Sequence, residues 1–124
     1  MPYLNITTNA PVNKRQKETI ERAISKAILL IPKEKEELLM VNFEDCASLS
    51  LSGDFSTPAS MIELRVHNVV IEMNEAELLE KVMSLATEVV SKVLDICPDR
   101  IYCTMPAVPY WTAAGLEILK GILK

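Results

Sequence analysis

The stretch that sets the fold is MPYLNITTNAPVN, residues 1–13. The β-branched and aromatic side chains within residues 2–8 predict a strand, and Asn9 and Pro11 mark a turn directly after it. Removal of Met1 before a small second residue is a routine maturation step, and it would leave Pro2 with a free secondary amine. A terminus that is tied into a sheet is ordered, so this amine would be held in a fixed place. Pro2 is therefore either an accident of the start site or the chemical centre of the protein.

Two long helices are predicted beyond this strand. The first begins near residue 14, because apolar residues recur from there at three- and four-residue steps, and Pro32 ends it. The second begins at Asn74, which is expected to cap it together with Glu77 in a capping-box-like arrangement. The sequence CPDR at 97–100 stops this second helix.

Further strands are predicted from apolar runs and from alternation with a period of two residues. They lie at 38–43, at 48–52, over most of 59–73 and at 101–105, with a turn at 53–58. The sequence PAVP at 106–109 breaks the chain. The tail that follows is expected to form either a short amphipathic helix or a strand that reaches a neighbouring subunit.

The order of these elements predicts an α/β fold of two β-α-β units that form a mixed sheet, because each crossover implies parallel pairing. At 124 residues we expect a single domain, 1–124, with halves at about 2–58 and 59–105 and a C-terminal tail. Two helices cover only one face of such a sheet. The other face must meet another layer, so an oligomer is expected, although monomers with one solvated sheet face exist.

Composition and charge exclude several classes of protein. The formal net charge is −4 and no Lys/Arg block is present, which argues against nucleic-acid binding. No apolar stretch approaches the length of a membrane span, and the first residues lack the features of a signal peptide, so we expect a cytoplasmic protein. The three cysteines have no CxxC spacing, which predicts reduced thiols. No Cys/His metal spacing is present either, so no metal is expected.

The chain resembles the macrophage migration inhibitory factor and D-dopachrome tautomerase family of the tautomerase superfamily. The order and spacing of several short stretches carry this resemblance over almost the whole chain. The stretches are MPYLNITTNAPVN at the start, Lys33 after the first helix, LSG at 51–53, TPA at 57–59, PDRIY at 98–102, and Trp111 in the C-terminal segment.

The resemblance implies a tautomerase fold assembled as a ring-shaped homotrimer, with active sites between subunits. It implies an isomerase that interconverts the keto and enol forms of small aromatic α-keto acids, phenylpyruvate-like or dopachrome-like, without a cofactor or a metal. Members of this family lose Met1. They can also be exported without a signal peptide, so a secreted protein with a receptor as partner is the alternative to a cytoplasmic enzyme.

Pro2 and Lys33 are the two residues to which the resemblance gives the main chemical roles. Pro2 is implied to be the acid–base. A free α-amino group titrates at about 7.7–8.0, and both an apolar pocket and a nearby cation lower the pKa of an amine towards working pH. Lys33 is implied to bind the substrate carboxylate. The charged run 33–37 is also typical of a solvated loop, and Lys35 is a rival because this loop carries one inserted residue.

Four further residues are candidates for substrate binding. His67, the only histidine, matches a position whose backbone amide binds substrate, although a lone histidine in a strand is more often structural. Tyr102 matches a tyrosine that lines the site from the adjacent subunit, and Thr104 replaces an Asn or Arg two residues on. Trp111 is a candidate wall of the pocket or of the subunit boundary. Tyr102 and Trp111 are equally consistent with ordinary packing.

Three functions are compatible with these residues. The first is a keto–enol tautomerase that uses Pro2. The second is a cytokine-like or host-mimicking trimeric binding protein with a vestigial tautomerase site. The third is a structural trimer with a degenerate site, because the 33–37 loop, the residues after His67 and Thr104 all depart from the family pattern.

Overall fold

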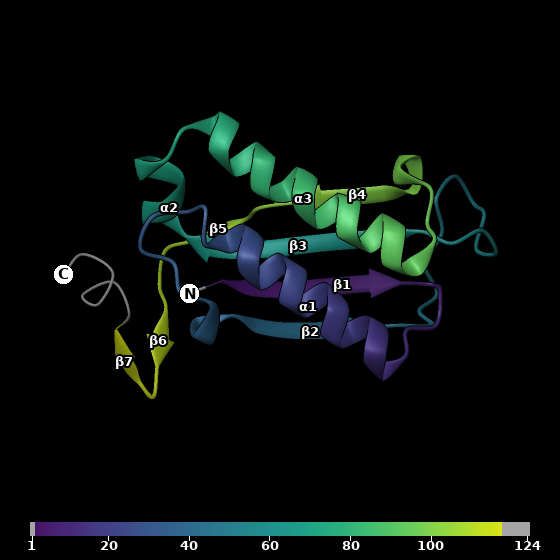
Figure 1. The fold of residues 1–124 in the computed structure, drawn as a ribbon, viewed down its shortest axis with the longest axis horizontal. Coiled ribbons are helices and arrows are strands. Elements are labelled where there is room, and N and C mark those ends of the chain that lie inside the picture. The colour runs from purple at the N-terminus through teal and green to yellow at the C-terminus, as the bar shows by residue number, and fades with distance from the viewer. Residues whose placement is uncertain (1, 118–124) are drawn as a thin grey trace.

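The computed structural model describes residues 2–117 and shows two long helices lying across one face of a sheet (Figure 1). The sheet has the strand order β2-β1-β3-β4, and the short strand β5 pairs with β3. The elements of these two layers are β1 (Tyr3–Thr8), α1 (Lys14–Ile28), β2 (Met40–Glu44), β3 (Ser60–His67), α3 (Ala76–Leu94), β4 (Ile101–Thr104) and β5 (Ala107–Val108). Within the described residues, no helix combines the length and the hydropathy needed to cross a membrane.

The sheet is built from two crossovers of the same kind. Helix α1 connects β1 to β2 and helix α3 connects β3 to β4, and both strand pairs are parallel. Strands β1 and β3 pair antiparallel in the middle, with Tyr3 opposite Arg65. The two parallel units therefore meet through their first strands, which makes the sheet mixed. The predicted α/β fold of two β-α-β units, with both helices on one face, is confirmed.

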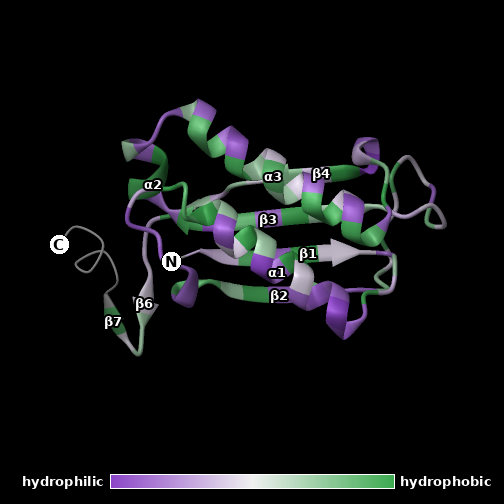
Figure 2. Cartoon of the chain, in the orientation of Figure 1, coloured by the Kyte–Doolittle hydropathy of each residue, from purple (hydrophilic) through white to green (hydrophobic). Residues whose placement is uncertain are grey.

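The central strand β1 faces two environments. Leu4 and Ile6 are fully buried beneath the helices, whereas Tyr3 and Asn5 lie on the opposite face and are half-buried. This alternation follows from the two-residue period of a strand. Figure 2 shows hydrophobic and hydrophilic residues mixed along α1 and α3, as expected for helices that bury one stripe. The core between the layers includes Leu4, Ile6, Ile20, Ile24, Ile28, Ile62, Leu64, Val82, Ala86 and Val90.

Helix α1 starts at a capping box. The Asn13 side chain accepts a hydrogen bond from the Gln16 amide at 2.8 Å, and the Gln16 side chain accepts one from the Asn13 amide at 2.9 Å. The helix ends at Ile28, earlier than the predicted stop at Pro32. The chain leaves the helix through tighter turns, in which the amide of Leu30 bonds to the carbonyl of Ala27. Ile31 stays in the core, 1% exposed, although it is outside the helix.

The segment 59–73 is only half strand. Strand β3 ends at His67, and Asn68–Met73 form the short helix α2. Asn74 therefore does not cap the following helix as predicted. Its side-chain amide instead donates to the Val70 carbonyl at 2.8 Å and so satisfies the C-terminal end of α2. Glu75 is the N-cap residue of α3 and makes no side-chain capping bond.

The predicted strand at 48–52 is absent from the structure. Leu51 forms only an isolated bridge with Asp54, because Ser52 and Gly53 have positive φ angles of 54° and 79° and turn the chain tightly between them. The described part of the tail does not form the predicted helix, and the alternative of a strand that reaches a neighbouring subunit stays a prediction. Instead, β6 (Thr112–Ala113) and β7 (Leu116–Glu117) make a small hairpin, and residues 118–124 lie outside the described residues.

Two side chains hold the loop between β2 and β3 in place of strand pairing. The Asn9 amide nitrogen donates to the carbonyls of Leu49, Phe55 and Thr57, and its oxygen accepts from the Ala59 amide at 2.9 Å. From the other side, the Arg100 guanidinium donates to the carbonyls of Asp54, Thr57 and Pro58. Backbone carbonyls of this loop are thus satisfied by side chains, which fixes an irregular segment. This loop therefore connects the turn after β1, which contains Asn9, with the turn before β4, which contains Arg100.

Asp54 makes the stability of this loop dependent on pH. Hydrogen bonds from the Thr57 hydroxyl and from the Thr57 and Ser56 amides lower the pKa of the Asp54 carboxyl to about 2. A lowered folded-state pKa means that the stabilisation is present above the ordinary value of 3.8 and is lost as pH falls from there towards 2.

We predict that Asp54→Asn lowers the urea midpoint at pH 6, and that this difference from the native protein shrinks between about pH 4 and pH 2. Urea unfolding followed by circular dichroism at about pH 4 and at about pH 2 measures this midpoint difference. The control is Glu80→Gln, which removes a carboxylate from the exposed side of α3. A midpoint difference for Asp54→Asn that is equal at both pH values contradicts the prediction.

Candidate active site

Pro2 lies in the wall of a hollow of about 610 Å³ at the end of the sheet where β1 begins. Figure 1 shows the N-terminus and strand β6 at this same end. The hollow is therefore built from segments far apart in the sequence. It is lined by Pro2, Tyr3, Leu38, Met40, Arg65, Val108, Tyr110, Trp111, Thr112, Ala113 and Ala114.

Pro2 is held in this position by the strand that follows it. The residue is buried, and its carbonyl accepts a hydrogen bond from the Met40 amide at 3.2 Å. The next residue, Tyr3, is already paired with β2 on one side and with β3 on the other. A ring nitrogen at this point is thus fixed by a two-sided strand. This is the ordered terminus that the sequence led us to expect.

Trp111 forms another wall of the same hollow. Its indole nitrogen donates to the Val108 carbonyl at 3.1 Å, which fixes the ring against β5. The ring is half-buried, whereas the preceding Tyr110 is 88% exposed. The structure therefore places Trp111 beside the hollow that contains Pro2, two of the six residues predicted for the site.

Arg65 supplies the charge in this hollow, and the sequence analysis did not select it. Its guanidinium lies 5.7 Å from the centre of the Tyr3 ring, and one of its nitrogens is 3.0 Å from a Glu63 carboxylate oxygen. The alternation of β3 could have indicated that Glu63 and Arg65 share a face. It could not have indicated that Arg65 lies opposite Tyr3, because the register between β1 and β3 is a tertiary contact.

Lys33 lies elsewhere. It follows the turn after α1 with a positive φ of 69° and lines a smaller hollow of about 80 Å³ against α2, with Val69, Val70 and Met73. The hollows of Pro2 and Lys33 have no lining residue in common. Its role as a carboxylate-binding residue stays a prediction.

His67 is buried, 4% exposed, and its side chain has a structural partner. The Nδ1 atom accepts a hydrogen bond from the Val69 amide at 3.0 Å, so that His67 is the N-cap of α2. This contact was not expected from the sequence, because the strand was predicted to continue through residues 68–73. The substrate contact that the resemblance implies for this residue is at its backbone, and it stays a prediction.

Tyr102 and Thr104 lie on β4, away from the hollow of Pro2. They occupy the face of the sheet that the helices leave open, opposite Met61 and Glu63 of β3. Tyr102 is 59% exposed. Strand β3 separates β4 from β1, so within one chain these two residues and Pro2 do not form one site. A role of Tyr102 in a site of the adjacent subunit stays a prediction.

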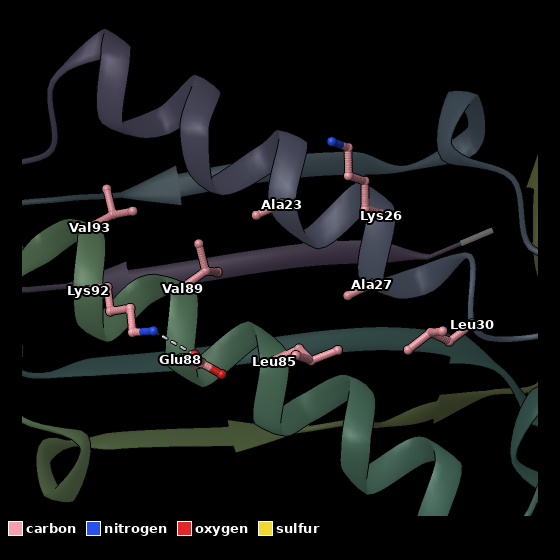
Figure 3. Close-up of a pocket in the computed structure, with 9 residues that line it drawn as sticks. All are labelled: Ala23, Lys26, Ala27, Leu30, Leu85, Glu88, Val89, Lys92 and Val93. Atoms are coloured by element: carbon pink, nitrogen blue, oxygen red, sulfur yellow. Dashed lines mark hydrogen bonds and ion pairs between the residues drawn. The ribbon is translucent and has the colours of Figure 1, made fainter.

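A second hollow, of about 560 Å³, lies between α1 and α3 on the side away from the sheet (Figure 3). It is lined by aliphatic side chains such as Ala27, Leu85 and Val89. Its polar contact is the exposed pair of Lys92 and Glu88, whose charged atoms are 2.7 Å apart. Solvent screens such a pair, and it offers no buried acid–base group.

The side chains that could bind a metal or act as thiol nucleophiles are spread over the described part of the chain. No group of three or more His, Cys, Asp or Glu side chains within residues 2–117 is arranged to hold a metal ion. The three cysteines are free, and burial raises the pKa of the Cys103 thiol to about 11. A thiol with such a pKa is protonated at neutral pH and is a poor nucleophile.

No protein-family model matches the sequence, and no curated protein matches it. Solved structures do match over nearly the whole chain. The MIF2 protein of Leishmania major superposes with a TM-score of 0.82 at 16% identity, covering 95% of this chain and 97% of its own. A macrophage migration inhibitory factor homologue from Prochlorococcus marinus gives a TM-score of 0.77 at 21% identity, with coverage of 93% and 97%.

A protein described as a fused 4-OT wild type symmetric trimer also matches, with a TM-score of 0.79 at 14% identity and coverage of 96% and 98%. At these identities the likeness concerns the fold alone. The chain has the fold of macrophage migration inhibitory factor, which confirms the fold that the sequence resemblance implied.

We predict that the side chain of His67 stabilises α2 as its N-cap. His67→Ala should lower the free energy of unfolding by about 1 kcal/mol or more, from the lost cap and the space left behind. His67→Asn, which can still cap the helix, should recover part of this loss. Chemical denaturation of the three proteins measures it. Equal stability of the Ala and Asn variants contradicts the capping role.

Proposed function

We propose that this protein is a keto–enol tautomerase of small aromatic α-keto acids, phenylpyruvate-like or dopachrome-like, in which Pro2 is the acid–base once Met1 has been removed. The observation that carries the proposal is the position of Pro2. It is buried at the start of a two-sided strand, in the wall of a hollow lined mostly by apolar side chains. The fold supports the same assignment, because it is a tautomerase fold.

The proposed reaction moves one proton between carbon and oxygen. The neutral nitrogen of Pro2 takes a proton from the carbon next to the carbonyl, and the C–H electron pair becomes the C=C bond of the enolate. The prolinium then gives a proton back to the oxygen, which completes the enol. Nothing is oxidised or reduced, so the step requires no redox cofactor. Proximity supplies much of the acceleration once the substrate is fixed beside Pro2.

The surroundings of Pro2 suit this role. A base must be partly neutral at working pH, and both an apolar environment and a fixed positive charge favour the neutral form of an amine. The hollow contains leucine, methionine, valine and tryptophan side chains and the guanidinium of Arg65. Trp111 is proposed to contact the aromatic ring of the substrate. The backbone at His67 is proposed to orient it.

We also propose that the protein acts as a homotrimer with its sites between subunits. The face of the sheet opposite the helices is left open in a single chain, and Tyr102 and Met40 on its strands are 59% and 69% exposed. Another layer would cover these residues. Tyr102 and Thr104 of one subunit are then proposed to line the Pro2 site of the next. The resemblance implies that Lys33 binds the substrate carboxylate, and Lys35 is the rival for this role.

The test of the reaction compares the native protein with Pro2→Gly. We expect the loss of phenylpyruvate enol absorbance to slow by about 100-fold or more in the variant, because a positioned acid–base contributes on that order. Pro11→Ala, in the turn after β1, is the matched control and should keep its activity. Intact mass must show that Met1 is absent from each protein.

Equal activity of the native and Pro2→Gly proteins would exclude Pro2 as the base. Inactivity of both, with both folded, would favour a trimeric binding protein over an enzyme.

The test of assembly is a native mass measurement. We expect a species of three times the 13.9 kDa chain mass, after correction for Met1. Tyr102→Glu, which places a charge on the open face, should shift this species towards smaller ones. A native protein that stays monomeric at micromolar concentration contradicts the trimer.

A further inference from the structure

The proposed reaction needs a positive charge that faces the substrate, because an α-keto acid carries a carboxylate next to its reacting carbonyl. Among the residues that line the hollow of Pro2, Arg65 is the charged one. The other lining residues are apolar, aromatic or hydroxyl-bearing. Lys33 lines a separate hollow against α2, whose other members include Val70 and Asn74.

The register of the sheet places Arg65 opposite the residue that follows Pro2, and both residues line the same hollow. Arg65 lies directly opposite Tyr3 in the antiparallel pair of β1 and β3. Neighbouring strands are about 4.8 Å apart and successive residues rise by about 3.3 Å, so the long arginine side chain can span the distance to a ligand held at Pro2. Strand pairing, and not a mobile loop, thus places the cation in the hollow that Pro2 lines.

Two contacts hold the guanidinium in this place. Its carbon lies 5.7 Å from the centre of the Tyr3 ring, within the range of a cation–π contact. One of its terminal nitrogens lies 3.0 Å from a Glu63 carboxylate oxygen. A guanidinium carries five N–H donors, so this ion pair leaves donors for a second carboxylate. The side chain is 47% exposed, which leaves it accessible to a ligand.

We propose that Arg65 binds the carboxylate of the ligand in the Pro2 site, and that the site therefore selects apolar or aromatic monocarboxylates. This inference rests on the proposed function and names the residue that recognises the substrate. Glu63 weakens binding of the ligand, because its negative charge repels the ligand carboxylate and competes with it for the guanidinium of Arg65. Tyr3 favours binding of the ligand, because its ring holds the Arg65 guanidinium at the wall of the hollow.

The experiment measures KM and kcat for phenylpyruvate in Arg65→Gln, Arg65→Lys, Glu63→Gln and Lys33→Gln. A hydrogen bond to a charged group contributes about 1.5–3 kcal/mol, so Arg65→Gln should raise KM by about 10- to 100-fold, with a smaller effect on kcat. Arg65→Lys should recover part of the loss. Glu63→Gln should lower KM. Lys33→Gln tests the position that the resemblance implies and should raise KM less than Arg65→Gln does. Lys81→Gln, on the exposed side of α3, is the matched control and should leave KM unchanged. Melting temperatures verify that each variant is folded.

A second measurement keeps the inference separate from the reaction. Binding of 3-phenylpropanoate, which cannot enolise in this way, is compared with binding of the neutral 3-phenylpropanamide. Arg65→Gln should weaken binding of the carboxylate by the same factor and leave binding of the amide unchanged. This holds even if the native protein has no turnover. A larger KM effect in Lys33→Gln than in Arg65→Gln overturns the inference. So does the lack of any preference of the native protein for the carboxylate over the amide.

Discussion

The pairing of β1 on both of its edges is the constraint on which the candidate site depends. This strand hydrogen-bonds to β2 on one side and to β3 on the other, and it buries Leu4 and Ile6 under both helices. Slipping it by one residue would turn these side chains out of the core and Tyr3 and Asn5 into it. The register is therefore strongly specified. Pro2 comes directly before the first paired residue, so its position is set by the core of the protein.

The same register assembles the rest of the hollow. It brings Arg65 opposite Tyr3 and Met40 opposite the same residue from the other side. Beyond β3, the pairing of β5 with Val66 and His67 carries the chain back towards the N-terminus, and Trp111 follows. The N-cap at His67 stops the strand just there, which lets α2 turn away. Secondary structure that looks ordinary thus creates a concave site from four distant segments.

The two ends of the sheet have different characters. At the end away from Pro2, Asn9, Arg100 and Asp54 fix a loop by hydrogen bonds to its backbone, and this part of the chain is shaped for rigidity. At the Pro2 end, the walls are apolar and half-open, with a single ion pair of Arg65 and Glu63. The open face of the sheet connects these ends. Tyr102 and Thr104 on this face become part of a site only if another subunit supplies the missing wall.

The sequence alone determined the elements with strong periodicity. The strand at 2–8, the helices that became α1 and α3, and the strand at 101–105 each follow from local patterns, because a period of 2 or 3.6 residues reports which side is buried. It also indicated Pro2 and Trp111, which the structure brings to one hollow. Local patterns failed at 48–52, at 68–73 and at Asn74. At these positions the backbone conformation depends on hydrogen bonds to residues distant in the sequence or to the end of a helix. One example is the hydrogen bond from the Asn9 side chain to the Leu49 carbonyl.

Only the tertiary structure decided which cation lies near Pro2. Lys33 and Lys35 are close to each other in the sequence and match the expected pattern. Arg65 is 63 residues from Pro2 in the sequence and lines the same hollow because of the strand register. A charge on a strand has no local signal that distinguishes a solvated residue from one facing a pocket. That distinction comes from which strand lies alongside and in what register. In this protein it is the antiparallel pairing of β1 with β3.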